Sequence, residues 1–253
     1  MTIDWPRDRF YVDQPLTPGN QLELPDHVAR QVNRVLRLKA GDSIVLFNGD
    51  GTDRLATIIE STRKHVRVDI TEVARPGVVL SPPEITLALA LIKSDRFELA
   101  VQKATELGVS AIVPVETERC VVSLPADRAQ SRVERWQRIA TEALEQCERA
   151  DHVAIHMPVP FDDLIRQRDE SLDLIAAERT GQSGLAGHLL RRPDRVRILI
   201  GPEGGFTPDE IDAAESKGWS RVTLGETILR SETAAIASVA MIRALASQAL
   251  SRE

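Results

Sequence analysis

The sequence predicts an α/β protein in which a parallel sheet with covering helices follows a small β-barrel. Short strand-like runs predominate before residue 74, whereas strand-like and helix-like segments alternate after residue 84. Near the C-terminus, two apolar runs each lead into a glycine-bearing turn and then a helix start. Ligands bind outside the carboxyl ends of strands in open α/β sheets. These two neighbouring turns therefore predict a binding site.

The N-terminal region has the pattern of a small barrel. Its four strand-like runs are residues 9–12, 43–47, 54–60 and 66–73. One helix-like segment, residues 26–38, lies between the first and second of these runs. Proline and glycine then cluster over residues 74–83, which is typical of a domain boundary. We therefore expect one domain over residues 1–75 and a second over residues 76–253.

The second region alternates between strands and helices. The predicted strands are residues 85–91, 111–115, 172–176, 196–200 and 221–224, and the predicted helices include 95–107 and 127–149. The apolar segment 234–250 has almost the length of a membrane span. Because Ser238, Arg243 and Ser247 interrupt it, we expect a packed helix and no membrane association.

The first glycine turn combines backbone freedom with a strong helix start. Gly201, Gly204 and Gly205 permit positive φ angles and close approach of the backbone to a ligand. Thr207 and Glu210 then form a Thr-x-x-Glu capping box. The alternative is a tight connection between strand and helix that binds nothing. A second turn of the same kind, within residues 222–234, favours a binding site.

The composition of the first turn argues against a nucleotide phosphate. Neither Gly-x-Gly-x-x-Gly nor Gly-x-x-x-x-Gly-Lys-Ser/Thr occurs there. Glu203 would also place a carboxylate where phosphates would lie. A ligand that carries an adenosine and a positive charge fits better, and the sulfonium compound S-adenosylmethionine is such a ligand.

At these residues the sequence resembles a known family. The stretches Ile-Gly-Pro-Glu-Gly-Gly-Phe and Leu-Gly-x-x-Ile-Leu-Arg-x-Glu-Thr-Ala are similar to those of the RsmE-type methyltransferases of the knotted SPOUT superclass. Further similar stretches are residues 27–42, 103–109 and 117–120, with Glu145, Gln146 and Arg149. The resemblance covers nearly the whole chain.

The resemblance implies both an activity and an architecture. Members of the family use S-adenosylmethionine to methylate N3 of a uridine in 16S ribosomal RNA of the small ribosomal subunit, in the decoding region. The implied fold is a PUA-like RNA-binding barrel followed by a domain with a C-terminal trefoil knot, whose loops surround the cofactor. The family also forms homodimers through the knotted domain, and the apolar segment 234–250 agrees with such an interface.

The turns and the resemblance together predict the site residues. We expect the cofactor to contact Leu199, Ile200, Gly201, Pro202, Glu203, Gly204, Gly205, Leu224, Gly225, Ile228, Leu229, Arg230, Thr233 and Ala234. We assign Arg230 to stabilisation of the uracil anion or to positioning of the target. Glu203 and Glu232 are the nearby carboxylates with a candidate catalytic role. Each also has a structural alternative, so the proton acceptor stays open, and no metal is expected.

Charge predicts local RNA contacts. The net charge is −6, and residues 1–75 carry equal numbers of acidic and basic residues, so no general basic surface is present. The RNA-binding candidates form two groups: Arg9, Arg34, Arg37 and Lys39 in the first domain, and Arg128, Arg132, Arg135 and Arg149 on the long helix. For the helix group, the alternative is an ordinary solvated face.

Cysteine content and the remaining alternatives complete the prediction. Cys120 and Cys147 have no metal-type spacing, which indicates free thiols in a reducing cytoplasm. An RNA-binding protein without catalytic activity, or a methyltransferase acting on another RNA, stays open. A cofactor-binding enzyme of small molecules is disfavoured by the separate β-rich domain.

Overall fold

The computed structural model describes residues 5–62, 65–167, 169–177 and 184–250, and the chain divides into two compact units. Unit 1 comprises Met1–Leu80 and Leu144–His152. Unit 2 comprises Ser81–Ala143 and Val153–Glu253. The break after Leu80 lies within the segment rich in proline and glycine. The inclusion of a later segment in unit 1 differs from the contiguous division that the sequence suggested.

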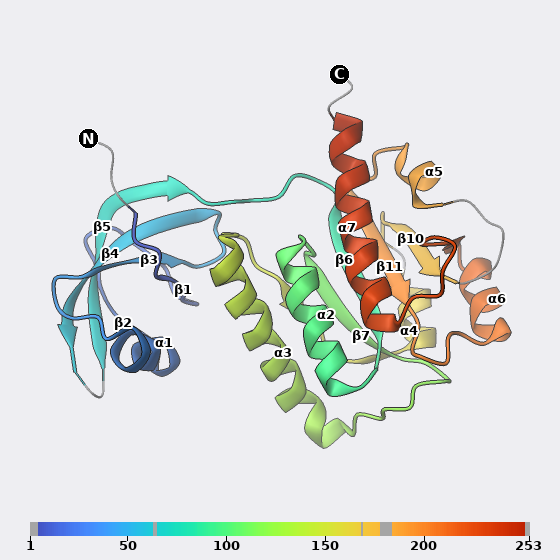
Figure 1. Ribbon diagram of the computed structural model, residues 1–253, viewed down its shortest axis with the longest axis horizontal. Coiled ribbons are helices and arrows are strands. Elements are labelled where there is room, and N and C mark those ends of the chain that lie inside the picture. Colours follow the sequence, from blue (N-terminus) through green and yellow to red (C-terminus); the bar gives the residue numbers. More distant parts are fainter. Residues whose placement is uncertain (1–4, 63–64, 168, 178–183, 251–253) are drawn as a thin grey trace. The chain divides into compact units, whose positions relative to one another are not determined.

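Unit 1 is built on a five-stranded mixed sheet in the order β1-β3-β4-β5-β2. Strands β1 and β3 pair in parallel, and the other pairs are antiparallel. Apolar side chains on one side of the sheet, such as Ile44, Leu46 and Val68, form the core. The strands, coloured blue to cyan in Figure 1, are β1 (Arg9–Tyr11), β2 (Gln21–Glu23), β3 (Ser43–Phe47), β4 (Thr52–Ser61) and β5 (Val66–Pro76).

The predicted helix of unit 1 has two parts. α1 (Asp26–Arg30) continues as the π-helical segment η1 (Gln31–Leu36). Arg37 then adopts a left-handed conformation with φ 57°, and the N–H of Leu38 donates to the carbonyl of Val32 at 3.0 Å. This turn ends the helix, and Arg34 and Arg37 are both exposed to solvent.

The segment Leu144–His152 is bound into unit 1 by hydrogen bonds. The Arg9 guanidinium donates to the carbonyls of Leu144 at 2.9 Å and Arg149 at 2.8 Å. The N–H of Gly51 donates to the carbonyl of Ala150 at 3.0 Å. These bonds give a partner to backbone carbonyls at and after the end of the long helix, which would otherwise lack one.

Unit 2 contains a parallel sheet of seven strands, which confirms the predicted α/β class. Six strands follow the order β12-β10-β11-β6-β7-β8, and β9 also pairs with β7. The strands are β6 (Glu84–Ala90), β7 (Ala111–Glu116), β8 (Ala154–Ile155), β9 (Val159–Pro160), β10 (Leu172–Ala176), β11 (Arg195–Ile200) and β12 (Ser220–Val222).

Helices cover both faces of this sheet (Figure 1). Leu164 and Ala214, from α4 and α6, pack with Leu199 of β11 on one face. On the other, α7 lies against β6 and β11, and α2 lies against α7. The helices are α2 (Ser94–Glu106), α3 (Ala126–Cys147), α4 (Phe161–Arg166), α5 (Leu185–Leu189), α6 (Pro208–Ser216) and α7 (Ser231–Leu250). Among the described residues, no helix combines the length and hydropathy that crossing a bilayer requires.

Candidate active site

The two glycine turns lie at the same edge of the unit 2 sheet. One follows β11 and the other follows β12, and both strands pair in parallel with β10 between them. The carboxyl ends of all three strands therefore point the same way. This edge is where an open α/β sheet binds its ligands.

The first turn, residues 201–206, is shaped by its glycines. A hydrogen bond of 2.9 Å from the N–H of Gly205 to the carbonyl of Pro202 closes it, and Gly205 has φ 65°. A Cβ on Gly201 would lie 3.0 Å from the ring of Phe206, so this position has no room for a side chain. The predicted capping box is present, because Thr207 and Glu210 each accept from the other's backbone N–H.

A segment that follows β7 supports this turn. The N–H of Glu118 donates to Oε1 of Glu210 at 2.8 Å, and Glu210 is buried. The Arg119 guanidinium donates to the carbonyls of Gly204 at 3.0 Å and Phe206 at 3.3 Å. Those two carbonyls are thus held by the protein. Sequence reasoning had noted residues 117–120 as a family match without assigning this role.

The second turn presents apolar side chains and one cation. Gly225 has φ 138°, and the Thr223 hydroxyl donates to its carbonyl at 2.8 Å. Ile228 is 56% exposed, and Arg230 is exposed just before α7 begins. Within the described part of the chain, the Arg230 guanidinium has no hydrogen-bond or ion-pair partner. It is therefore available to an anion.

Arg96 of α2 joins the two predicted carboxylates. Its Nη1 lies 3.2 Å from Oε1 of Glu203, and its Nε lies 3.8 Å from Oε1 of Glu232. Glu232 is buried, and across the described residues its Oε2 has no hydrogen-bond partner. Sequence reasoning missed Arg96, because no motif surrounds it. The pairing of β6 with β11 brings it to the site.

The structure gathers the predicted cofactor residues at one edge of the sheet. They occupy the end of β11, the two turns and the first turn of α7. This set fits S-adenosylmethionine. The apolar side chains of the second turn suit an adenosine, and the carboxylate of Glu203 suits a positive charge. A Cβ built on Gly205 would meet no atom within 4 Å, so the first turn is open at this position. The same carboxylate disfavours a phosphate.

The predicted RNA-binding residues divide by burial. Arg34, Arg37 and Lys39 are exposed in unit 1, as a phosphate contact requires. Arg9 and Arg149 are instead buried, with 6% and 2% of their surface exposed. Arg9 binds Asp53, and Arg149 binds Asp151 through two bonds of 2.9 and 2.7 Å. We therefore remove Arg9 and Arg149 from the RNA-binding candidates.

The three arginines near the start of α3 differ in their pairing. Arg135 makes two hydrogen bonds of 2.7 Å to Glu98 of α2. Arg132 donates to the hydroxyl of Ser94 at 2.6 Å and lies 3.8 Å from the same Glu98. The Arg128 guanidinium is exposed and has no partner within the described residues. The solvated-face alternative thus fits Arg135 better than Arg128.

Comparison with known proteins gives one consistent family. Residues 80–243 match the RNA methyltransferase domain, and residues 34–71 match the RNA methyltransferase PUA domain. The chain is 34% identical to ribosomal RNA small subunit methyltransferase E of Rickettsia conorii over 245 residues, covering 95% of this chain and 96% of that protein. It is 27% identical to the Bacillus subtilis protein of the same name, covering 92% and 95%.

Two solved structures are similar over both units. A methyltransferase from Legionella pneumophila, in complex with the bound cofactor SAM, has a TM-score of 0.89 and 35% identity and covers 93% of this chain and 96% of its own. Ribosomal RNA small subunit methyltransferase E from Neisseria gonorrhoeae, bound to S-adenosyl methionine, has a TM-score of 0.86 and 33% identity, with 94% and 97% covered.

Proposed function

This chain belongs to the ribosomal RNA small subunit methyltransferase E family, and we propose that it methylates N3 of one uridine in 16S ribosomal RNA. The observation that carries the proposal is the pair of glycine turns at one sheet edge, with Glu203, Glu232 and Arg230 around it. The family assignment agrees with the resemblance found in the sequence.

S-adenosylmethionine is the cofactor, and it supplies an electrophilic methyl group on a sulfonium. The backbone of residues 201–206 and the side chains of the second turn would hold it. Because rigid turns keep their donors in place before a ligand binds, this edge can orient the cofactor at little entropic cost. Arg119 and Glu210 provide that rigidity by bonding across the first turn.

The substrate must lose a proton before methylation. Uracil N3 carries a hydrogen between two carbonyl groups, so its lone pair is unavailable until that proton leaves. Negative charge then spreads over O2 and O4. We propose that Arg230 stabilises this charge, since its guanidinium is exposed and unpaired in the described part of the chain.

Of the two carboxylates, we propose that Glu203 accepts the proton. Its side chain is 29% exposed, compared with 11% for Glu232. Glu232, at the first turn of α7, holds Arg96 in place. Glu203→Gln should lower kcat at neutral pH, and the deficit should shrink at alkaline pH, where uracil N3 ionises unaided. A deficit that is the same at every pH would assign Glu203 a structural role.

The reaction itself is tested by methyl transfer. Small ribosomal subunits that lack their own modification are incubated with the protein and S-adenosylmethionine labelled in the methyl group, and the nucleosides are separated. We expect the label in 3-methyluridine. Label in another nucleoside would point to a different RNA target, and cofactor binding without transfer would favour an RNA-binding protein without activity.

Unit 1 is the RNA-binding domain of this proposal. Arg34, Arg37 and Lys39 place three exposed cations close together in sequence, and phosphate contacts supply much of RNA affinity. The double variant Arg34→Glu/Arg37→Glu should weaken methylation of ribosomal subunits. Its affinity for S-adenosylmethionine, measured by calorimetry, should match that of the wild type. Unchanged methylation by this variant would contradict the assignment.

The resemblance also supports a trefoil knot in unit 2. The strand order places the late strand β11 between the earlier strands β6 and β10, as a threaded chain requires. When a single molecule is pulled from both ends, a knot would leave the unfolded chain shorter than its full contour length. An unfolded length equal to that of the free chain would exclude it.

The assembly and the compartment are also proposals. A homodimer through α7 would follow the family. Cys120 and Cys147 are both free thiols. Free thiols suit the reducing cytoplasm, which is also where ribosomal RNA is modified in the proposed reaction.

A further inference from the structure

Val35 and Leu36 of η1 form an exposed apolar pair in unit 1. Their exposed fractions are 72% and 37%. In a regular α-helix both positions would continue the side on which Val28 and Val32 are buried. The π-helical segment carries them away from the core instead, because its hydrogen bonds span five residues rather than four. The backbone of η1 therefore exposes two aliphatic side chains that an ordinary helix would bury.

The chain returns to the core through a left-handed residue directly after this apolar pair. Arg37 has φ 57°, a conformation that is unfavourable for a residue other than glycine. Its N–H donates to the carbonyl of Val32, and Leu38 then packs against the core of unit 1. π-helical turns and left-handed residues are both uncommon, and where they occur they are often part of a functional site.

Hydrogen bonds to the end of β4 hold the turn in this shape. The Asn33 side chain donates to the carbonyl of Thr62 at 2.5 Å and accepts from the hydroxyl of Ser61. The same hydroxyl lies 3.1 Å from the carbonyl oxygen of Leu38. The residues just before and just after the apolar pair are thus fixed to a neighbouring strand. The pair is held in its exposed position before any partner binds.

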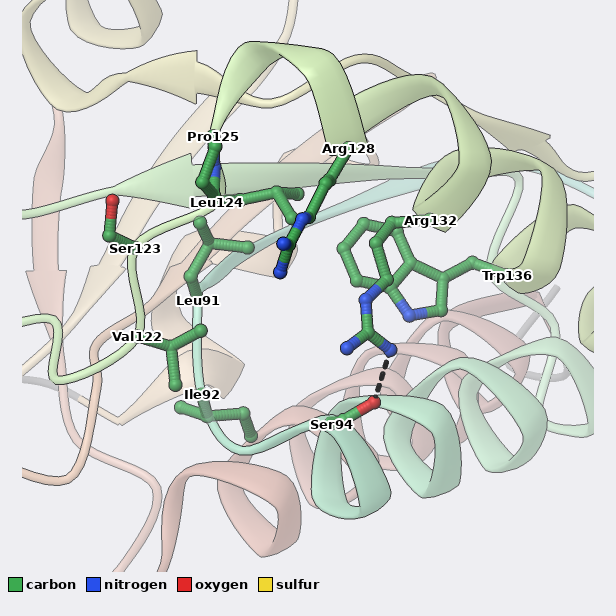
Figure 2. A pocket seen from close by; sticks show the side chains of 10 residues that line it. All are labelled: Leu91, Ile92, Ser94, Val122, Ser123, Leu124, Pro125, Arg128, Arg132 and Trp136. Carbon is green, nitrogen blue, oxygen red and sulfur yellow. Dashed lines mark hydrogen bonds between the residues drawn. The ribbon is translucent and has the colours of Figure 1, made fainter.

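Cations flank the apolar pair. Arg34, Arg37 and Lys39 lie within six residues of sequence that contain no acidic residue. All three side chains are exposed, and in the part of the chain that the structure describes none has a hydrogen-bond or ion-pair partner. Arg132 of α3 differs, because the hydroxyl of Ser94 holds it at 2.6 Å (Figure 2). The cations beside the apolar pair are therefore available to phosphates.

An apolar pair between unpaired cations matches the chemistry of an RNA strand. Each base has an apolar face, and each is flanked by charged phosphates. Aliphatic side chains that enter between two bases unstack them, while neighbouring cations bind the phosphates. Residues 34–71, which include the pair, match the RNA methyltransferase PUA domain. An anionic lipid surface has similar chemistry, but two aliphatic side chains bury little apolar area for anchoring a helix there.

We propose that Val35 and Leu36 insert between two adjacent bases of the RNA and unstack them, while Arg34 and Arg37 contact the flanking phosphates. This inference rests on the proposed function, in which unit 1 binds the RNA. Its new element is the apolar pair, because phosphate contacts alone do not separate bases. Unstacking is part of the free-energy cost of bringing a base out of folded RNA, so RNA binding by unit 1 offsets that cost.

Unstacking is tested with the fluorescent base 2-aminopurine, whose emission is quenched when it stacks on neighbouring bases. The probe is an RNA hairpin that carries 2-aminopurine in an unpaired loop of adenosines. Saturating wild-type protein should raise the emission about twofold. Val35→Ala/Leu36→Ala should still bind the hairpin, because the cations remain, but most of the rise should be lost. A rise that this double variant keeps in full would overturn the proposal.

Val79→Ala is the matched control for the apolar pair. Val79 is also an exposed aliphatic residue of unit 1, at 58%. It follows the end of β5 that pairs with Thr52, whereas Ser61, which binds Asn33, lies at the opposite end of the β4–β5 ladder. Val79→Ala should keep the full rise in emission. If it loses as much of the rise as the double variant does, the apolar pair has no specific effect on the bases.

The phosphate contacts are tested separately with Arg34→Gln/Arg37→Gln. This variant should bind the hairpin more weakly, and the slope of log affinity against log salt should fall by about 0.7 for each lost contact. At saturating protein it should still raise the emission, because the apolar pair is intact. If it loses the rise while Val35→Ala/Leu36→Ala keeps it, the cations and not the apolar pair act on the bases.

Vesicles of phosphatidylserine and phosphatidylcholine test the lipid alternative. The wild-type protein should not sediment with these vesicles. Sedimentation that is lost in Val35→Ala/Leu36→Ala, together with an unchanged 2-aminopurine emission, would assign the apolar pair to a lipid surface and overturn the RNA proposal.

The unstacking proposal and the methylation proposal fail in different ways. Protein that raises the emission through the apolar pair, but forms no 3-methyluridine in ribosomal subunits, would refute the methylation proposal and keep the unstacking. If the wild type forms 3-methyluridine, Val35→Ala/Leu36→Ala should lower kcat/KM for ribosomal subunits about tenfold. Wild-type kcat/KM and full emission in that variant would refute the unstacking and keep the reaction.

Discussion

At the scale of the residue, burial decides what a basic side chain does. Arg9 is close in sequence to Arg7 and looks like a surface cation. In the structure its guanidinium binds Asp53 and two backbone carbonyls and lies 3.5 Å from the centre of the Phe47 ring. The sequence could not predict this, because the partner carbonyls come from a segment about 140 residues away.

Arg9→Met should therefore destabilise unit 1. The substitution leaves the buried Asp53 with fewer partners and two carbonyls unsatisfied, which costs about 3 kcal/mol of unfolding free energy. Urea unfolding followed by circular dichroism measures the change. Arg7→Met, at an exposed neighbour, should change stability by less than about 0.5 kcal/mol. A stable Arg9→Met protein with weakened RNA binding would instead restore Arg9 as an RNA contact.

Glycines offer a second test at the residue scale. Gly201→Ala would place a Cβ 3.0 Å from the Phe206 ring and force the first turn to move. We expect the affinity for S-adenosylmethionine to fall about tenfold, equivalent to about 1.4 kcal/mol, in isothermal titration calorimetry. Gly187→Ala is the control, since no atom lies within 4 Å of its added Cβ. Equal affinities of both variants for S-adenosylmethionine would show that this turn does not bind the cofactor.

At the scale of the element, local patterns predicted the main helices and strands and missed those without a pattern. The capping box at Thr207 and Glu210 predicted the start of α6, and apolar runs predicted β6, β7, β10 and β11. The short helices α4 and α5 were missed, because five or six residues are too few to establish a periodicity. The π-helical widening of η1 has no sequence signal that we can identify.

Glu98 of α2 pairs with α3, and its ionisation makes the stability of the protein depend on pH. Hydrogen bonds from Arg135 of α3 hold the pKa of this α2 carboxyl below its ordinary value of 4.5. The charged form is therefore favoured in the folded state. Its contribution to stability is fully present at pH values above 4.5 and is lost as the pH falls through the lowered pKa of the folded state.

Glu98→Gln should accordingly destabilise the protein at pH 7 and have little effect in acid. The loss should be small, because the Arg135 side chain is 54% exposed and solvent weakens the ion pair. Thermal unfolding of both proteins from pH 7 down to pH 3 measures the difference. A difference in melting temperature that is as large at the lowest pH as at neutral pH would show that the charge of Glu98 does not cause it.

At the scale of the whole molecule, local sequence patterns predicted the two glycine turns but not the distant segments that pack against them. The two glycine turns lie about 20 residues apart and carry recognisable motifs, so local reading sufficed for them. Arg96 and the 117–120 segment lie about 100 residues earlier and reach the first turn only through the order of the strands. Long-range pairing of this kind, and the return of residues 144–152 to unit 1, leave no local pattern.

The surface of α7 predicts how two molecules associate. Ala235, Val239 and Ile242 lie on the buried side of the helix. The other side carries mostly small apolar residues, and there Met241 is 39% exposed. Leu99 of the adjacent α2 is 42% exposed. A second copy of this chain, presenting the same apolar face, would remove it from water by two-fold pairing.

Met241→Arg should therefore convert a dimer into a monomer. A charge buried in an apolar interface without a partner opposes association strongly. Light scattering at micromolar concentration should give twice the chain mass for the wild type and one chain mass for the variant. Leu190→Arg, at an apolar residue that is 79% exposed on another part of unit 2, should remain dimeric. If the wild type and both variants are monomers, α7 does not form a dimer interface, and each active site is complete within one chain.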